Sequence, residues 1–275
     1  MRRAPVPNPW PGPSAQNFRM PPAIELFQQW PLLLFVAAVF AAAGVVKGVI
    51  GLGLPTLSMA LLGSAMPPAD AAALLVLPSL LTNVWQLRPW GALPAMLRRL
   101  ATMQAGVCAG TLAGAAAIGA PAGTWAVACL GVSLIAYAGW GLSGARPRVA
   151  PRTQRWLGPL AGAATGLVTA ATGVFVVPAV PYLQALALDR DELMQAMGLS
   201  FTVSTVALAI GLGFNGRYPV SAFAESALML LPAFAGMGLG QALRRRLPPA
   251  LFRSCFLASL IVLGVYMIAH EALAR

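Results

Sequence analysis

Long runs of apolar residues, separated by short polar segments, fill the chain from about residue 31 onward. A helix needs roughly 17 to 25 apolar residues to cross the hydrocarbon core of a bilayer. Runs of this length predict membrane-spanning helices at about 31–50, 71–87, 100–119, 124–143, 157–177, 193–213, 219–241 and 250–270. Two further runs, 55–65 and 178–187, are too short to cross. The pattern therefore predicts an all-α, polytopic membrane bundle.

The composition agrees with this class and excludes a soluble domain. Of the 275 residues, 59% are hydrophobic and 9% are charged, a balance typical of membrane proteins. Residues 1–30 hold seven prolines and no apolar core of a cleavable signal, so we expect a Pro-rich N-terminal tail there. Cys108, Cys129 and Cys255 lack metal-ligand spacing, so we predict neither a metal site nor another cofactor.

The net charge of +11 comes from arginines in the short loops between the predicted spans. Cytoplasmic loops of membrane proteins collect basic residues, so these arginines indicate topology. No basic soluble domain is present to bind nucleic acid, and we exclude that partner.

The spans divide into two halves, 31–143 and 157–275, joined by a basic linker at 144–156. The first span of each half carries a polar residue between glycines, Lys47 or Thr165, and a break and a short run follow it. The next span opens with an acidic residue and has polar residues nine and thirteen positions later: Asp70, Ser79 and Asn83, or Asp191, Ser200 and Ser204. This order predicts an internal duplication of five helical elements per half.

The arginines predict that the two halves are inverted. The loop after the third element carries three arginines in the first half, within 88–99, but only Arg217 in the second. The loop after the fourth element carries none in the first half and four in the second, within 244–253. Two copies of opposite orientation would show this exchange. Whether each short helix exits on the far side or forms a re-entrant hairpin with its predecessor stays open.

Lys47 is the only lysine of the chain, and it lies inside the first long apolar run. An ammonium at membrane depth is costly and therefore marks a functional site, most simply one for an anion. The alternatives are that Lys47 extends to a membrane surface or pairs with a carboxylate. No acidic residue lies deep in a predicted span, and Glu225, about six residues into its helix, comes nearest.

Glycine and proline interrupt the chain after Lys47 and again before Pro178. Irregular backbone at membrane depth is tolerated only where protein or a water-filled cavity covers it. Pro55 and Pro178 suit the first turn of a new helix, and two helix N-termini starting near the midplane would both attract an anion. The candidate substrate-binding residues are Lys47, Gly51, Gly53, Pro55, Thr56, Ser58, Ser79, Asn83, Thr165, Thr169, Thr172, Gly173, Pro178, Ser200, Ser204 and Thr205.

Some of these features have simpler explanations. Glycines four residues apart, such as Gly106 with Gly110 and Gly236 with Gly240, let helices pack closely. Serine and threonine in a span often bond to their own helix. A membrane scaffold is therefore the alternative to a carrier. An intramembrane enzyme is not predicted, because the spans hold no carboxylate pair, histidine cluster or positioned Ser and His partnership.

Two segments resemble a known family. They are KGVIGLGLPTLSMALLG from Lys47 and GLVTAATGVFVVPAVPYLQALALDRDELMQAMGLSFTVSTVALA from Gly166. Both are similar to the repeat signatures of the sulfite exporter TauE/SafE family, also called the toluene sulfonate uptake permease family. The resemblance covers nearly the whole chain beyond residue 30 and implies secondary transport of sulfite, organosulfonates or related small anions.

From the resemblance we expect a multi-pass protein of the bacterial inner membrane that exports its anion by alternating access. Small organic carboxylates are an alternative substrate class. The expected partners are the small anion and the lipid bilayer, and a homodimer is left open.

Overall fold

The computed structural model describes residues 30–273, except 146, 219, 245 and 247, so the predicted Pro-rich tail lies outside the described residues apart from Trp30. The described residues form helices and contain no strand. The helices are α2 (Trp30–Ile50), α3 (Leu54–Leu62), α4 (Pro68–Gln86), η1 (Trp90–Ala92), α5 (Leu93–Ile118), α6 (Gly123–Leu142), α7 (Pro151–Thr172), α8 (Ala179–Ala185), α9 (Arg190–Phe214), α10 (Val220–Leu228), α11 (Leu230–Leu243) and α12 (Pro249–Leu273).

All but one of the predicted spans coincide with a single helix, and the two short runs form α3 and α8. Seven helical segments of the described chain are long and apolar enough to cross a membrane, which supports a multi-pass membrane protein. The long helix outside this set is α7, predicted as a span at 157–177. Its hydropathy is lowered by the exposed Arg152 and Arg155 of its first turns and by threonines and glycines that are buried against other helices, such as Thr165 and Gly166. The run 219–241 forms two helices, α10 and α11, instead of one.

Prolines start several of these helices. Pro55, Pro68, Pro94 and Pro151 all lie in the first two positions of a helix, where proline removes no intrahelical hydrogen bond. At the start of α9, Asp189 accepts from the Glu192 amide while Glu192 accepts from the Asp189 amide, which forms a capping box.

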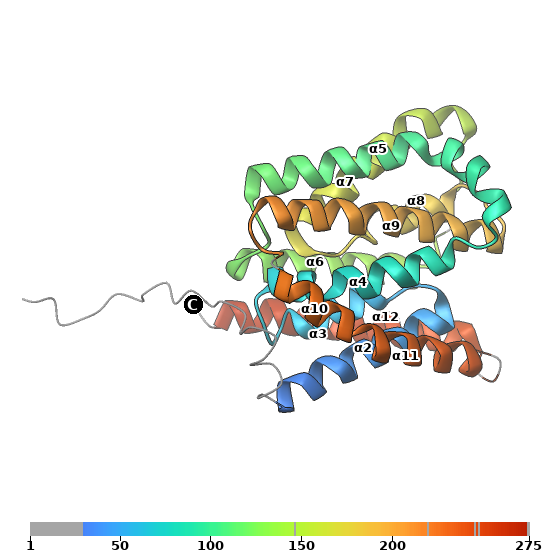
Figure 1. Cartoon of the computed structure of the whole chain (residues 1–275). Coiled ribbons are helices and arrows are strands. Elements are labelled where there is room, and N and C mark those ends of the chain that lie inside the picture. Colours follow the sequence, from blue (N-terminus) through green and yellow to red (C-terminus); the bar gives the residue numbers. More distant parts are fainter. Residues whose placement is uncertain (1–29, 146, 219, 245, 247, 274–275) are drawn as a thin grey trace, which may run out of the picture.

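The long helices lie roughly side by side (Figure 1), and the main pairs are α2 with α11, α5 with α7, α6 with α12, and α4 with α9. Glycines allow the first two pairs to approach closely. A Cβ built on Gly48 would overlap the Met237 carbonyl of α11, and one built on Gly110 would overlap the Ala163 carbonyl of α7. The packing role predicted for the spaced glycines of α5 and α11 is therefore confirmed.

Both short helices return toward the end of the bundle where their predecessor begins. At α8, the Val149 amide just before α7 donates to the Ala185 carbonyl at 2.9 Å. At α3, Gly53 lies beside Phe256 near the start of α12, and Gly63 lies beside Met267 near its end. The end of α12 and the start of α2 lie at the same end of the molecule (Figure 1). Helices α2 and α3, and likewise α7 and α8, thus form the re-entrant hairpins that the sequence left open.

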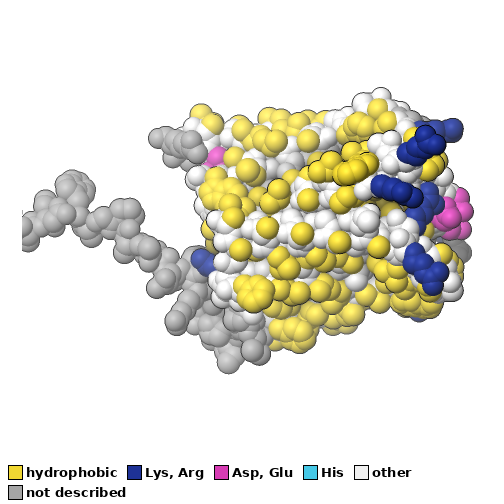
Figure 2. Space-filling model, turned by 90° about the horizontal axis from the view of Figure 1, so that it is seen from above, with side chains coloured by type: hydrophobic (Ala, Val, Ile, Leu, Met, Phe, Trp, Pro, Cys, Tyr) yellow, Lys and Arg dark blue, Asp and Glu magenta, His cyan; other side chains and the backbone are white. Residues whose placement is uncertain are grey.

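The two ends of the bundle differ in charge. We call one the arginine end: it holds the loops α4–α5, α6–α7, α8–α9 and α11–α12, and Figure 2 shows Lys and Arg side chains gathered there. The opposite end holds Arg217 between α9 and α10, close enough to Asp70 of α4 to attract it. Asp70 and Glu225 are both buried, at 7% and 5% exposure. Glu225 is thus covered by protein, and Asp70 lies close enough to repel it.

Candidate functional site

Lys47 lies in the last turn of α2, immediately before the break that precedes α3. Its side chain is 4% exposed, and its ammonium group donates a hydrogen bond to Oδ1 of Asn83 on α4. Within the described part of the chain, no carboxylate lies near enough to act on this ammonium. Lys47 therefore neither extends to the surface nor forms an ion pair, and its partner is a neutral amide.

Asn83 continues this contact toward the second half of the chain. Its Nδ2 lies 3.5 Å from Oγ1 of Thr205 on α9, which is a long and weak hydrogen bond. The Thr205 hydroxyl donates to the Phe201 carbonyl of its own helix at 2.7 Å. Three predicted residues on α2, α4 and α9 are thus joined in one buried polar chain.

The break between α2 and α3 is built by glycines with left-handed backbone. The Gly51 amide donates to the Lys47 carbonyl at 2.8 Å, and φ is 77° at Gly51 and 112° at Gly53, values that other residues rarely adopt. A Cβ on Gly51 would overlap Met194, and one on Gly53 would overlap Val46. Pro55 is the second residue of α3. The tight bend directly after Lys47 therefore requires glycine at both positions, for its backbone conformation and for lack of space.

Several predicted hydroxyls are fully buried and have no hydrogen-bond partner among the described residues. They are Thr56 and Ser58 of α3, Ser79 of α4, and Ser200 and Ser204 of α9. A buried polar group without a partner costs about 1–3 kcal/mol. Residues four apart lie on one face of a helix, so Ser79 shares a face of α4 with Asn83. Helices α4 and α9 pack together, and each brings a buried pair of polar residues.

The predicted threonines of α7 behave differently. The hydroxyls of Thr165, Thr169 and Thr172 donate to the carbonyls of Ala161, Thr165 and Val168, each at 2.7 Å. A hydroxyl whose proton is used in this way has none left for an anion. All three side chains are buried. Their role as ligands stays a prediction, and the geometry favours the own-helix bond that the sequence offered as the alternative.

The break between α7 and α8 also differs in detail from its prediction. Gly173 has φ 71° and caps α7, but α8 begins at Ala179 with Pro178 as its N-cap. Val180 is the second residue of α8, and its amide donates to the Val176 carbonyl at 2.9 Å. Helix α8 has 7 residues. Its start therefore offers fewer free amides than two matched helix N-termini would require.

Two glutamines were not among the predicted residues. Gln86 follows Ser79 and Asn83 on the same face of α4 and donates to the Met194 carbonyl of α9 at 3.0 Å. Gln104 of α5 is 8% exposed, and neither of its amide atoms has a partner in the part of the chain that the structure describes. The signal in the sequence was available: both are uncharged amides within or beside an apolar run, and Gln86 continues the three-to-four residue spacing of α4.

Comparison with known proteins agrees with the architecture. No curated protein and no solved structure matches the chain significantly. A family model described as sulfite exporter TauE/SafE matches residues 36–267, from the first turns of α2 to the last turns of α12. Since the match covers most of the chain, this multi-pass membrane protein belongs to the sulfite exporter TauE/SafE family.

Proposed function

We propose that this protein is a secondary transporter that exports small anions such as sulfite or organosulfonates across the bacterial inner membrane. The family is one of transporters, and the fold is that of a multi-pass membrane protein. The position of the arginines supports the orientation, because basic loops collect on the cytoplasmic side. The arginine end is accordingly assigned to the cytoplasm.

The observation that carries this proposal is the environment of Lys47. A buried ammonium without a counter-ion is strongly unfavourable, and several kcal/mol of desolvation remain even after relaxation. Asn83 compensates this cost only in part, because an amide oxygen carries a partial charge. An anion bound beside Lys47 would supply the missing charge, which explains why a lone lysine is placed in the bundle interior.

The unpartnered hydroxyls support an oxyanion in particular. Ser79, Ser200 and Ser204 are buried, lie on the two helices that bear Asn83 and Thr205, and have unused donors. A sulfite or sulfonate group has three oxygens that accept several hydrogen bonds at once. One ammonium and a few hydroxyls match a group of one or two negative charges.

We further propose that the two halves are inverted repeats that move against each other in alternating access. The close contacts support the repeat. Gly44 and Gly48 of α2 pack on α11, while Gly162 and Gly166 of α7 pack on α5 in the same way. The corresponding hairpins, α2–α3 and α7–α8, begin at opposite ends of the bundle. Paired repeats of this kind place a substrate site at their interface.

The membrane potential is a sufficient driving force for export. With the inside negative, it assists the exit of an anion by about 2.3 kcal/mol per charge per 100 mV. A carrier of this kind therefore needs no coupling ion.

The test is anion flux in proteoliposomes that contain purified protein. Lys47→Ala should reduce sulfite or sulfoacetate flux to the rate of protein-free vesicles, because the full charge of the site is removed. Size-exclusion profile and unfolding temperature would establish that the variant is folded, and Arg246→Gln, an exposed arginine outside the site, is the matched charge control. Undiminished flux in Lys47→Ala would refute the role of Lys47 in the site, whereas parent protein with no flux above that of protein-free vesicles would favour a scaffold.

A further inference from the structure

A hollow of about 260 Å³ opens at the arginine end, beside the break between α2 and α3. Its wall includes Ile50 and Leu52, which flank Gly51 of the break, and residues from the start of α9, the end of α11 and the start of α12. We call this hollow the vestibule. It lies next to the bend that follows Lys47, the residue on which the proposed function depends.

Three arginines from different segments line the vestibule: Arg190 at the start of α9, Arg244 at the end of α11 and Arg253 in α12. Within the described residues no carboxylate pairs with them. The acidic side chains nearest to Arg190 in sequence are Asp189, Asp191 and Glu192: Asp189 and Glu192 form the capping box of α9, and Asp191 is exposed. Arg253 donates to the Gly141 carbonyl at 3.4 Å. The positive-inside rule accounts for arginines at this end, but not for three of them around one hollow.

A methionine and a glutamine separate the vestibule from Lys47. Met194 lines the vestibule and packs directly on Gly51, where it occupies the space that a Cβ would fill. The Gln86 side chain donates a hydrogen bond to the Met194 carbonyl at 3.0 Å, and Gln86 lies one turn beyond Asn83 on α4. Met194 is thus the vestibule residue that packs on the bend after Lys47, and its side chain is unbranched and flexible.

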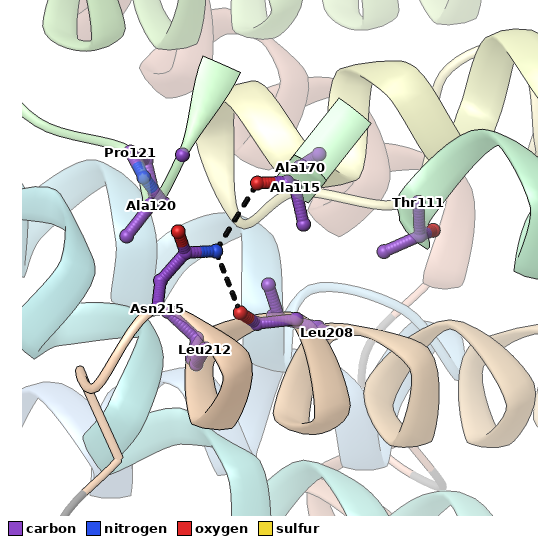
Figure 3. Close-up of a pocket in the computed structure, with 10 residues that line it drawn as sticks. Thr111, Ala115, Ala120, Pro121, Ala170, Leu208, Leu212 and Asn215 are labelled. Carbon is purple, nitrogen blue, oxygen red and sulfur yellow. Dashed lines mark hydrogen bonds between the residues drawn. The ribbon is translucent and has the colours of Figure 1, made fainter. Parts of the chain in front are cut away.

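The opposite end has no comparable hollow among the cavities described. The small cavity there measures about 10 Å³, the space of about one water molecule. Asn215 at the end of α9 closes it (Figure 3), because its Nδ2 donates to the carbonyls of Ala115 and Gly211 at 3.1 and 2.8 Å. Among the described cavities, the space at the arginine end is therefore much larger than that at the opposite end.

We propose that the vestibule is an anion-collecting site that receives small sulfur oxyanions and organosulfonates at the arginine end and delivers them to Lys47 when Met194 moves aside. This inference rests on the proposed function for the delivery step. The collecting step depends only on the charge and shape of the vestibule. Clefts lined by one sign of charge raise the local concentration of opposite ions and their arrival rates by 10- to 1,000-fold.

The collecting step can be measured without transport. Ile50→Cys, in a chain whose three native cysteines are replaced by alanine, places a thiol on the vestibule wall. The rates of its modification by an anionic reagent, sulfonatoethyl methanethiosulfonate, and a cationic one, trimethylammonioethyl methanethiosulfonate, are compared. The anionic reagent should react about tenfold faster after correction for intrinsic reactivity. It is itself an organosulfonate and so carries the chemistry of the proposed ligand.

Arg244→Gln should lower this ratio about threefold or more, since one of three charges is lost. Arg246→Gln is the matched control, because Arg246 lies two residues away, is exposed and does not line the vestibule. Methanesulfonate at millimolar concentration should slow modification by the anionic reagent in the parent chain. A ratio near one, or equal effects of the two arginine variants, overturns the proposal.

Flux measurements then test delivery. Arg244→Gln should raise the anion concentration at half-maximal flux several-fold and leave the maximal rate near that of the parent, because Lys47 is intact. A lowered maximal rate with unchanged half-saturation would contradict a collecting role. The two proposals fail separately: absence of flux in the parent protein removes the proposed function, whereas a thiol ratio insensitive to Arg244 removes the vestibule.

Discussion

The proposed repeat pairs Lys47 in α2 with Thr165 in α7, and each lies between two glycines that pack on a neighbouring helix. The side chains nevertheless do opposite things. Lys47 donates across the bundle to Asn83, while Thr165 donates to Ala161 of its own helix. A similar glycine spacing thus surrounds a charged side chain that contacts another helix in one half, and a hydroxyl that bonds only to its own helix in the other. The comparison teaches that similar scaffolding does not imply equal participation in the site.

The next helices continue this difference. Asn83 of α4 is engaged with both Lys47 and Thr205, whereas Ser204, its counterpart on α9, has no partner. The first half therefore holds the charge and its amide neighbour, and the second half contributes hydroxyls from α9. An anion between them would be held asymmetrically, with one ammonium on one side only.

The largest expected effect comes from making the halves alike in charge. Thr165→Lys would place a second ammonium at a position of 0% exposure without an amide partner. An uncompensated buried charge costs about 3–5 kcal/mol, so we expect little monodisperse protein after extraction. Thr165→Met, of similar length and without charge, is the control. Equal yields of the two variants would show that this position has solvent or polar partners.

Replacing the partner of Lys47 by an acid should nearly abolish transport without unfolding the protein. Asn83→Asp gives the ammonium a permanent counter-ion at the position of the present acceptor, and this carboxylate competes with the anion. We expect flux to fall about 100-fold, in line with 1.5–3 kcal/mol for a charged hydrogen bond that the substrate must displace. The unfolding temperature should stay at or above that of the parent. Adding Lys47→Ala to this variant should lower the unfolding temperature, because the new carboxylate would then be buried without its counter-ion.

A smaller and more diagnostic effect is expected at Ser200, whose hydroxyl is buried without a partner. Ser200→Ala removes an unpaired polar group, so the ligand-free protein should be as stable as the parent or more stable. Anion binding should weaken about tenfold, the value of a hydrogen bond to a charged group.

The measurement for Ser200→Ala is the unfolding temperature with and without sulfoacetate, since binding stabilises the folded state. Thr202→Val serves as control on the same helix, because the Thr202 hydroxyl donates to the Gly198 carbonyl. A loss of stability in ligand-free Ser200→Ala would contradict the unpaired hydroxyl.

The smallest effect is expected for Thr165→Val, which keeps the shape of the side chain and removes only its bond to Ala161. Proteoliposome flux should change less than about twofold, because the bond lost is a local one worth about 1 kcal/mol to the helix. A tenfold loss would mean that the hydroxyl turns toward the anion and that both halves participate equally.

Much of this fold could be predicted from hydrophobic length alone. The spans, the two short helices and the close glycine contacts all follow from local sequence, since each depends on a run of residues or on a four-residue spacing. The importance of Lys47 could also be predicted, because a single lysine in an apolar run has few explanations. Its contact with Asn83 joined two residues that the sequence had already proposed.

Other features depend on packing that a single sequence does not encode locally. Helix α7 begins with exposed arginines and also carries threonines that are buried, and the burial of these threonines is evident only once other helices pack on α7. Which hydroxyls bond to their own helix depends on rotamers, and Thr165 and Ser200 differ here although both are buried. Met194 and Gln86 meet Gly51 only because α9 lies across the break.

The glycine contacts have a mechanical consequence. Along α2 with α11, and along α5 with α7, the backbones touch so closely that even a methyl group would collide with a carbonyl. Such seams cannot slide or ratchet, since ridges and grooves are replaced by direct main-chain contact. We therefore expect the two helices of each pair to move together as one rigid body. We expect any opening of the protein at boundaries with looser glycine contacts, such as that between α4 and α9, where a Cβ on Gly198 would lie 3.2 Å from the Asn83 carbonyl and Asn83 faces Thr205.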